Sequence, residues 1–518
     1  MTSRHAGPPR ARRTALSLTA AALALATVAA CTTPEPAVAP ITGPADALTT
    51  APDAALGAYY DQKLAWHECD DFECADLTVP IDYDNPGDGD ITIKVLKAPA
   101  RNQGKRIGSL VVNPGGPGGS GVQYARSADF IVGTDVRSYF DIVGFDPRGV
   151  GQSAPIDCLE DDALDEFLGT DPTPDDPSEQ EGLVAAAQTM AQGCAEGNPD
   201  LIAHVSTVDA AKDMDVLRAA LGDGHLNYLG KSYGTFLGAT YAELFPERVG
   251  RFVLDGVVPP DLTSAELAKG QAQGFELATR AYVEDCVSEG DCPLGNSVDD
   301  GMAWIRDFLE SLDRDPLPTD DPAVPELTEA WGSLGLAAAM YDQGAWGILT
   351  DALREAQSGS GASLLGLANT YADRVPGGGY TGNIMEVIWA VNCLDRPDSP
   401  DPETYEGYED DFATVAPTWG PFLAWGSLAC GVWPVKGENP PHEISAAGSN
   451  PIVVVGTTRD PATIYEWSVQ LRDQLDNAVL VSLDGDGHTA YTRGSRCVDD
   501  AIDAYYVEGT LPKDGLTC

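Results

Sequence analysis

The chain has 518 residues, of which 43% are hydrophobic, and its formal net charge is −49. This length and apolar content allow a large buried core, arranged as one domain with an insertion or as about two or three smaller domains. So negative a charge repels nucleic acid and anionic lipid headgroups, which excludes nucleic acid as a partner and excludes a basic membrane-binding face.

Residues 1–31 have the composition of a lipoprotein signal peptide. Arginines precede an apolar run at residues 15–30, which is too short for a stable membrane span. The stretch Val28-Ala29-Ala30-Cys31 resembles a bacterial lipobox, so we expect Cys31 to be lipidated; ordinary cleavage beside an incidental cysteine is the alternative. The pair Arg12-Arg13 also allows a twin-arginine signal. We therefore expect an exported protein that a lipid anchor holds at the cell envelope, or else a secreted one.

The segment after the signal is expected to be a tether. Residues 32–55 are rich in Pro, Ala and Thr and lack periodicity, which is typical of a flexible linker, and the folded part is predicted to start near Leu56.

An even number of cysteines remains after Cys31, which in an exported chain predicts disulfides. Their connectivity does not follow from the sequence, and nearest-neighbour pairing is the simplest hypothesis. It joins Cys69 with Cys74, Cys158 with Cys194, Cys286 with Cys292, Cys393 with Cys430, and Cys497 with Cys518. The histidines lack metal-site spacing and no C-x-x-C motif occurs, so we expect neither a metal nor another cofactor.

Alternating strand and helix patterns predict an α/β fold. Short, mostly β-branched segments predict strands at Ile91–Leu96, Ser109–Val112, Phe140–Gly144, Leu226–Leu229, Arg251–Leu254, Ile452–Val455 and Val479–Leu483. Helical patterns such as 208–221 and 236–245 lie between them, which favours a mostly parallel sheet with crossover helices.

The interval from about Pro259 to Cys430 breaks this alternation because its pattern is helical, as in 265–286, 298–312 and 336–357. A structureless loop of that length is implausible inside a compact domain, so we expect an inserted helical cap over the active edge. The predicted organisation is a core in two parts, 56–258 and 431–518, with a cap at 259–430.

A nucleophile elbow is predicted where a strand, a sharp turn and a helix pattern follow one another. The turn is Gly230-Lys231-Ser232-Tyr233-Gly234, in which the two glycines leave room at the tightest positions. The G-x-S-x-G pattern is weak by itself, and an ordinary turn serine is the alternative.

A serine nucleophile needs a histidine base and an orienting carboxylate. Only His442 and His488 follow Ser232 in the chain, and His488 alone comes directly after a predicted strand, so it is the expected base. Asp460 follows the preceding strand and is the expected acid. Its competitors are Asp255, which also ends a strand, and Asp484 and Asp486, which share the loop of the histidine.

An oxyanion hole is expected from the amide of Tyr233 and from the glycine-rich loop that follows the strand at 109–112. Gly116 is the expected second donor, with Gly115 beside it. A phosphate-binding loop is the rival interpretation, but its lysine and Ser/Thr are missing. Arg148, after the next strand, is expected to brace the loop network, with substrate contact as the alternative.

Taken together, these motifs resemble the exported actinobacterial α/β-hydrolases of the tripeptidyl aminopeptidase type, which are related to proline iminopeptidases. The motifs are Asn113-Pro-Gly-Gly-Pro-Gly118, Gly144-Phe-Asp-Pro-Arg-Gly149, Gly230-Lys-Ser-Tyr-Gly-Thr235, Asp255-Gly256, Asn392-Cys393 with Asp395, Cys430 with Trp433-Pro434, Asp460-Pro461 and His488-Thr489. The resemblance covers about Leu56 to Cys518 and implies an α/β-hydrolase fold with Ser232, Asp460 and His488 as the triad. Lys231 departs from the family pattern and leaves the pocket lining open.

We therefore expect an exported serine peptidase of the tripeptidyl aminopeptidase kind, acting on peptides through an acyl-enzyme. A carboxylesterase or lipase is the alternative, and a lipid-anchored binding protein on an inactive hydrolase fold is a third reading. An aminopeptidase needs a buried carboxylate for the substrate ammonium, and Glu386 and Asp395 in an apolar cap segment are the candidates. The acidity of the whole chain favours plain solvation of such groups. The sequence leaves the oligomeric state open.

Overall fold

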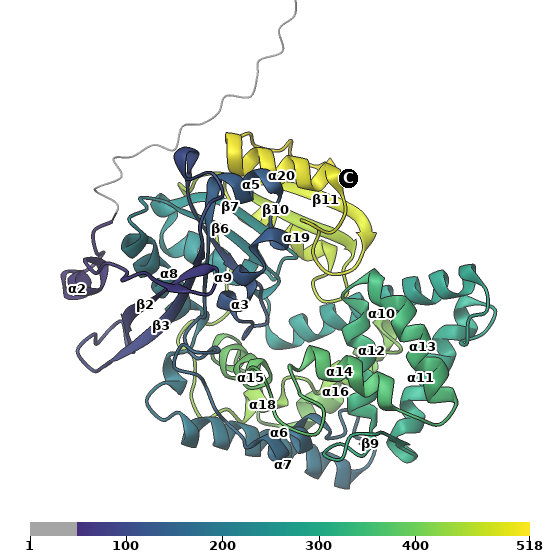
Figure 1. Ribbon diagram of the computed structural model, residues 1–518. Coiled ribbons are helices and arrows are strands. Elements are labelled where there is room, and N and C mark those ends of the chain that lie inside the picture. Colours follow the sequence, from purple (N-terminus) through teal and green to yellow (C-terminus); the bar gives the residue numbers. More distant parts are fainter. Residues whose placement is uncertain (1–48) are drawn as a thin grey trace, which may run out of the picture. The chain divides into compact units, whose positions relative to one another are not determined.

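The computed structural model describes residues 49–518 (Figure 1). The predicted signal peptide, Cys31 and most of the predicted tether lie outside these residues. The first described helical turn, Ala54–Leu56, begins with Asp53 accepting a hydrogen bond from Ala55 N–H, and it ends where the folded part was expected to start. Within residues 49–518, no helix has both the length and the apolar composition to span a membrane.

Ten strands of the described chain form one sheet, in the order β1-β2-β3-β5-β4-β6-β7-β10-β11-β12. Neighbours from β5 through to β12 are parallel, whereas β1, β2 and β3 pair antiparallel at the other end. The strands are β1 (His67–Cys69), β2 (Phe72–Pro80), β3 (Asp90–Ala98), β4 (Gly108–Asn113), β5 (Phe140–Phe145), β6 (Leu226–Lys231), β7 (Val249–Asp255), β10 (Ile452–Arg459), β11 (Ala478–Asp486) and β12 (Leu516–Thr517).

Every predicted strand is present, and the α/β-hydrolase fold class is confirmed. The central strands are mainly apolar because helices cover both faces of the sheet, and β4 and β5 are buried along their whole length. The sequence did not reveal β1, β2 and β12. β2 alternates buried and exposed residues over most of its length, and it contains charged residues. This pattern is typical of a strand near the edge of a sheet.

Two hydrophobic clusters lie on the two faces of the sheet. On β10, Ile452 and Val454 point to one cluster while Val453 and Val455 point to the other, which follows from the period of two along a strand. The first face is covered by α8 (Thr207–Leu221), α9 (Tyr233–Leu244) and α19 (Tyr465–Gln474). The second is covered by α3 (Gly121–Arg126), α4 (Ala128–Ile131), α5 (Thr134–Tyr139) and α20 (Arg496–Glu508).

Helices α10 to α18 form the cap, green in Figure 1, between β7 and β10 of the core. They are α10 (Ser264–Glu289), α11 (Val298–Arg314), α12 (Glu329–Met340), α13 (Trp346–Gln357), α14 (Ala362–Tyr371), α15 (Ile384–Asp395), α16 (Pro402–Val415), α17 (Gly420–Ala424) and α18 (Leu428–Gly431), with a short β8 (Leu317–Pro318) and β9 (Glu326–Leu327). Buried side chains from α10 to α14 give the cap a hydrophobic core of its own. The helical pattern at 336–357 is two helices, because Asp342 caps a turn at Gly344.

Two further helices lie beside the cap although they belong to the segment between β5 and β6. They are α6 (Asp161–Leu168) and α7 (Pro177–Gly197), drawn below α15 and α18 in Figure 1. Phe167 packs edge to face on Trp389 of α15, and α7 contacts α18. The cover over the sheet edge is therefore made by two separate insertions, whereas the sequence indicated only the one at 259–430.

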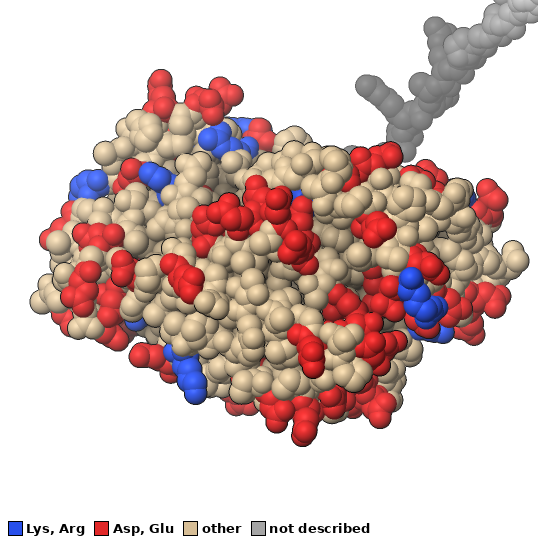
Figure 2. Space-filling view, turned by 90° about the horizontal axis from the view of Figure 1, so that it is seen from below, with Lys and Arg blue, Asp and Glu red and all other residues tan. Residues whose placement is uncertain are grey.

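Five disulfides join the same pairs that nearest-neighbour pairing gives. Two of them hold parts of the cover: Cys158–Cys194 fixes α7, and Cys393–Cys430 joins α15 to α18. The surface is strongly acidic. Figure 2 shows one face on which Asp and Glu are spread widely and Lys and Arg are sparse.

Candidate active site

The predicted elbow lies between β6 and α9. Ser232 adopts φ 57° and ψ −128°, a strained conformation that turns its side chain out at the carboxyl edge of the sheet. The flanking glycines are required by close packing. A Cβ on Gly230 would lie 2.2 Å from Gly234 O, and a Cβ on Gly234 would lie 2.8 Å from Asn113 Oδ1. Ser232 lines the large cavity described below.

Asp460 and His488 meet at the same edge, after the adjacent parallel strands β10 and β11. His488 Nδ1 lies 2.9 and 3.0 Å from the two oxygens of Asp460, and both side chains are buried. Amides of Ala462, Thr463 and Thr489 donate to the same carboxylate. These donors fix the orientation of the Asp460 carboxylate, which faces Nδ1 of His488 and so favours the ring form with its proton on that nitrogen. His488 Nε2 is buried and has no hydrogen-bond partner in the described chain.

Asp255, the competing candidate for the orienting acid, binds groups other than the side chain of His488. Its carboxylate accepts hydrogen bonds from the amides of Ala490 (2.9 Å) and Tyr491 (3.0 Å) and faces Lys231 Nζ at 3.6 Å. Lys231 also donates to Tyr491 O at 2.7 Å. Burial raises the pKa of Asp255, and the Lys231 charge counteracts that shift. The buried pair therefore ties the nucleophile turn to the loop that carries His488.

The remaining sequence competitors lie elsewhere. Asp484 and Asp486 form ion pairs with Arg459, and Asp484 is exposed. His442 is exposed, with Nδ1 2.9 Å from Pro440 O. None of these three contacts Asp460 or His488 through a hydrogen bond in the described chain.

The glycine-rich loop after β4 lies against the elbow. A Cβ on Gly115 would lie 2.7 Å from Ser232 Cβ and 2.6 Å from Lys231 O, so only glycine allows this approach. The amide of Gly115 donates to Asn113 Oδ1 at 2.9 Å and is therefore occupied, which corrects the expectation that it could help to bind an oxyanion. The amides of Gly116 and Tyr233 have no partner within residues 49–518, and Gly116 lines the same cavity as Ser232.

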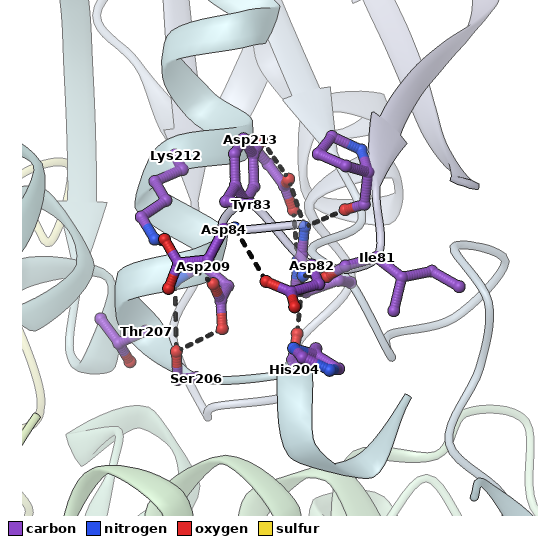
Figure 3. A network of polar contacts seen from close by, with 12 residues as sticks. Ile81, Asp82, Tyr83, Asp84, His204, Ser206, Thr207, Asp209, Lys212 and Asp213 are labelled. Atoms are coloured by element: carbon purple, nitrogen blue, oxygen red, sulfur yellow. Dashed lines mark hydrogen bonds and ion pairs between the residues drawn. The ribbon is translucent and has the colours of Figure 1, made fainter. Parts of the chain in front are cut away.

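Arg148 lies in the loop after β5 and does not line the cavity that contains Ser232. It is buried, forms a two-pronged ion pair with Asp213 at 2.7 and 2.8 Å, and donates to the carbonyls of Pro80, Ile81 and His204. Asp213 also accepts from Tyr83 at 2.7 Å (Figure 3). This bonding matches the expected bracing role and leaves no donor for a substrate.

A cavity of about 430 Å³ opens above Ser232 between the sheet edge and the cap. Most of its lining is apolar or aromatic, including Phe275, Tyr341, Trp389 and Trp419. No Asp or Glu of the described chain lines it, and Arg396 is its one charged lining residue there. A cavity of this size and polarity suits a peptide or an ester with an apolar acyl group.

Neither Glu386 nor Asp395 is among the residues that line this cavity, which does not support their expected role in binding a substrate ammonium. Glu386 accepts hydrogen bonds from the amides of Cys158 and Leu159. Asp395 accepts from Thr207 N–H and from Thr207 Oγ1, whose oxygen also contacts the Tyr233 hydroxyl. Burial raises the pKa of Asp395 to about 6. Both carboxylates are buried for structural reasons, because they bind backbone amides of the neighbouring segments.

Sequence reasoning missed two side chains near the cavity. Thr463 Oγ1 lies 3.4 Å from His488 Nδ1, and Arg396 follows directly after Asp395. A basic residue at the end of an apolar segment in so acidic a chain was the available signal for Arg396. Three carboxylates at the cap, Asp171, Glu179 and Asp313, have oxygens within 4.8 Å of one another, and nothing else indicates an ion there.

Comparison with known proteins supports the same fold and chemistry. Residues 416–518 match the model of the family described as TAP-like protein. Serine protease Hip1 of Mycobacterium tuberculosis is 38% identical over 86% of this chain and 87% of the relative. Carboxylesterase B of M. tuberculosis is 38% identical over 88% of this chain and 90% of the relative.

A tripeptidyl aminopeptidase of Streptomyces lividans is 31% identical over 91% of this chain and 88% of the relative. All three relatives are named as hydrolases, and each match extends over most of both chains. Together with the parallel sheet and the serine elbow at its carboxyl edge, these matches identify the chain as a hydrolase that belongs to the actinobacterial α/β-hydrolases of the tripeptidyl aminopeptidase type.

Proposed function

We propose that this chain is a serine peptidase in which Ser232 is the nucleophile, His488 the general base and Asp460 the orienting acid. The observation that carries the proposal is the His488–Asp460 pair, held at 2.9 Å at the same sheet edge as the strained Ser232. Asp460 keeps the proton on Nδ1, which leaves Nε2 as the nitrogen that accepts the serine proton. Nε2 has no hydrogen-bond partner in the described chain, which leaves it open to the serine proton.

The reaction follows from this arrangement. Ser232 Oγ attacks the scissile carbonyl as its proton passes to His488 Nε2, and a tetrahedral oxyanion forms. The amides of Tyr233 and Gly116 stabilise that oxyanion, since neither donates to another group of the described chain. The protonated His488 then donates to the leaving group, and water hydrolyses the acyl-enzyme by the reverse path. No cofactor takes part in these steps.

Peptides are the proposed substrates because two of the three relatives carry peptidase names. A carboxylesterase activity is the second candidate, and the apolar cavity favours it, since such a lining accepts a fatty acyl group as well as apolar side chains. The same nucleophile and oxyanion donors serve esters and amides alike.

We also propose that the protein is exported and anchored through a lipidated Cys31. Five disulfides in the folded part support an oxidising compartment. Mass spectrometry of the mature amino terminus tests this proposal, and Cys31→Ser should release the protein from membranes. An unmodified amino terminus on the membrane-bound protein would contradict it.

The deciding experiment compares turnover of p-nitrophenyl esters with that of peptidyl aminomethylcoumarins whose amino ends are either free or acetylated. A peptidase hydrolyses the peptide amides, and preference for the free amino end identifies an aminopeptidase. Turnover of esters alone would replace the peptidase by the carboxylesterase. Absence of all turnover, together with no labelling by a fluorophosphonate probe, would leave only a binding protein on this fold.

A further inference from the structure

Arg396 is a buried cation in the wall of the cavity that holds Ser232. It follows α15 directly, and only 2% of its surface is exposed. A cation at a helix carboxyl end is favourable, which explains a basic residue at this position. It does not explain why the guanidinium is buried against a cavity instead of reaching solvent.

The guanidinium is almost without partners in the described chain. Its Nε donates to Leu262 O at 3.0 Å, and its centre lies 4.4 Å from the ring of Phe236. Nη2 is buried and has no hydrogen-bond partner. No carboxylate of the described chain lies within 4.0 Å of its nitrogens. Asp395, which precedes it, and Asp261 attract it only at longer range. Asp395 instead directs both oxygens to Thr207.

Other buried arginines of the same chain are paired. Arg148 lies 2.7 Å from Asp213, Arg218 lies 2.8 Å from Asp215, and Arg374 lies 2.7 Å from Asp165. A buried charge without a counter-ion costs free energy, and in a chain with 80 acidic residues a partner would be easy to supply. The missing partner of Arg396 thus indicates an anion that arrives with the substrate.

We propose that Arg396 binds a carboxylate carried by the substrate or released on the product. The planar guanidinium matches a carboxylate through two parallel hydrogen bonds, and most of the remaining cavity wall is apolar. The preferred ligand is therefore an apolar molecule with one carboxylate. This inference rests on the proposed function and names the substrate class of that same site.

The carboxylate has two possible sources. It lies on the acyl side if the substrate is an acid-bearing acyl group, such as an acidic side chain or a dicarboxylic acid monoester. It lies on the leaving-group side if it is the free carboxyl end of a short peptide. The acidic surface in Figure 2 repels anions at long range, so the selectivity must come from the desolvated site itself.

The test uses matched substrate pairs that differ in one carboxylate. The acyl-side pair is p-nitrophenyl hydrogen glutarate and p-nitrophenyl pentanoate, and the leaving-group pair is an apolar peptide with a free carboxyl end and its amide. In the unmutated protein we expect kcat/KM to be about 10- to 100-fold higher for the carboxylate member of one pair. That pair identifies the source of the carboxylate.

Three variants complete the test. Arg396→Gln should bring the ratio of kcat/KM between the carboxylate substrate and its neutral partner close to one. It should not lower the melting temperature, because it removes an unpaired buried charge. Arg396→Lys should keep part of the ratio, since it retains the charge but not the two-pronged geometry. Arg314→Gln is the control, because Arg314 is exposed on α11 and pairs only with Glu310, and it should keep the full ratio.

Two results would overturn the inference: no preference in either pair for the unmutated protein, or an unchanged ratio in Arg396→Gln. A lower melting temperature with equal losses for both members of a pair would make Arg396 structural and would also overturn it. If Arg396→Gln does not fold, the kcat/KM ratios of the unmutated protein and of Arg396→Lys still test the inference. Absence of all turnover and of fluorophosphonate labelling would instead contradict the proposed function.

Discussion

The carboxyl edge of the sheet and the cap both line the cavity, and they hold their acidic side chains in different ways. Asp460 is held by amides two, three and 29 residues away, all in the loops after β10 and β11. Glu386 and Asp395 in the cap bind groups 228 and 188 residues away in sequence. Sheet-edge positions therefore follow from local motifs and strand order, whereas cap positions depend on contacts that no short motif records.

The first prediction tests the sheet edge with the largest expected effect. Ser232→Ala should abolish fluorophosphonate labelling and lower kcat by about 10⁶, because it removes the proposed nucleophile. Peptide mapping of the labelled protein should place the adduct on Ser232. Ser333→Ala is the control, since it removes another hydroxyl from the cavity wall and should leave labelling unchanged. An adduct on any other residue would refute the assignment.

Asp460→Asn should fold normally and lower kcat by about 10⁴, because an amide no longer selects the Nδ1-protonated form of His488. Circular dichroism and steady-state kinetics measure the two parts of this prediction. The control is Asp484→Asn, because Asp484 is exposed and binds only Arg459 and Thr458 in the described chain. If Asp460→Asn lowered kcat by less than about tenfold, the orienting acid would have to be another residue.

Gly115→Ala sharpens the comparison by testing the loop rather than the reacting side chains. The new Cβ would meet Lys231 O at 2.6 Å and Ser232 Cβ at 2.7 Å, so the loop and the Gly116 amide must shift. We expect kcat to fall by about 10² with little change in KM, as for a lost oxyanion donor. Gly87→Ala, where a Cβ would meet nothing within 4 Å, is the matched control. Unchanged kcat would exclude Gly116 as a donor.

Glu329 in the cap should make stability depend on pH. Burial raises its pKa to about 8 from 4.5, so between these values the unfolded chain has lost a proton that the folded chain keeps. Stability should therefore fall as pH rises through this window. Glu329→Gln should remove the loss and gain about 3 kcal/mol at pH 8 but little at pH 5.

Denaturant unfolding at both pH values measures this difference. Glu326→Gln, at an exposed position on β9, should show no such dependence. An equal change in stability for Glu329→Gln at pH 5 and pH 8 would contradict the raised pKa.

Glu386→Gln has the smallest expected effect and contrasts the cap with the sheet edge most directly. It should cost about 1–2 kcal/mol of stability, because the carboxylate accepts two backbone amides. The ratio of kcat/KM for free and acetylated peptides should not change, since Glu386 does not line the cavity. A selective rise in KM for peptides with a free amino end would restore its role in binding the ammonium.

The sequence by itself predicted seven of the ten described strands of the sheet and the placing of the candidate triad at one edge of it. Strand periodicity, the elbow glycines and the order Ser232, Asp460, His488 are local or topological features, and parallel strands must place their carboxyl ends together. The five disulfides agree with the nearest-neighbour hypothesis, although two of them join cysteines 36 and 37 residues apart, which sequence distance alone does not specify.

Tertiary structure alone decided which charged groups of the cap face the substrate. Glu386 lies in the first turn of α15 and Arg396 directly follows the end of that helix. Glu386 binds the segment before α6, whereas Arg396 lines the cavity. The difference depends on how α15 rotates against α7, α9 and the sheet edge, and on the insertion of α6 and α7, which the sequence did not assign to the cover. In the sequence, a charged residue in an apolar segment does not reveal whether it binds another part of the protein or a ligand. Only the positions of its partners in the tertiary structure decide between these two roles.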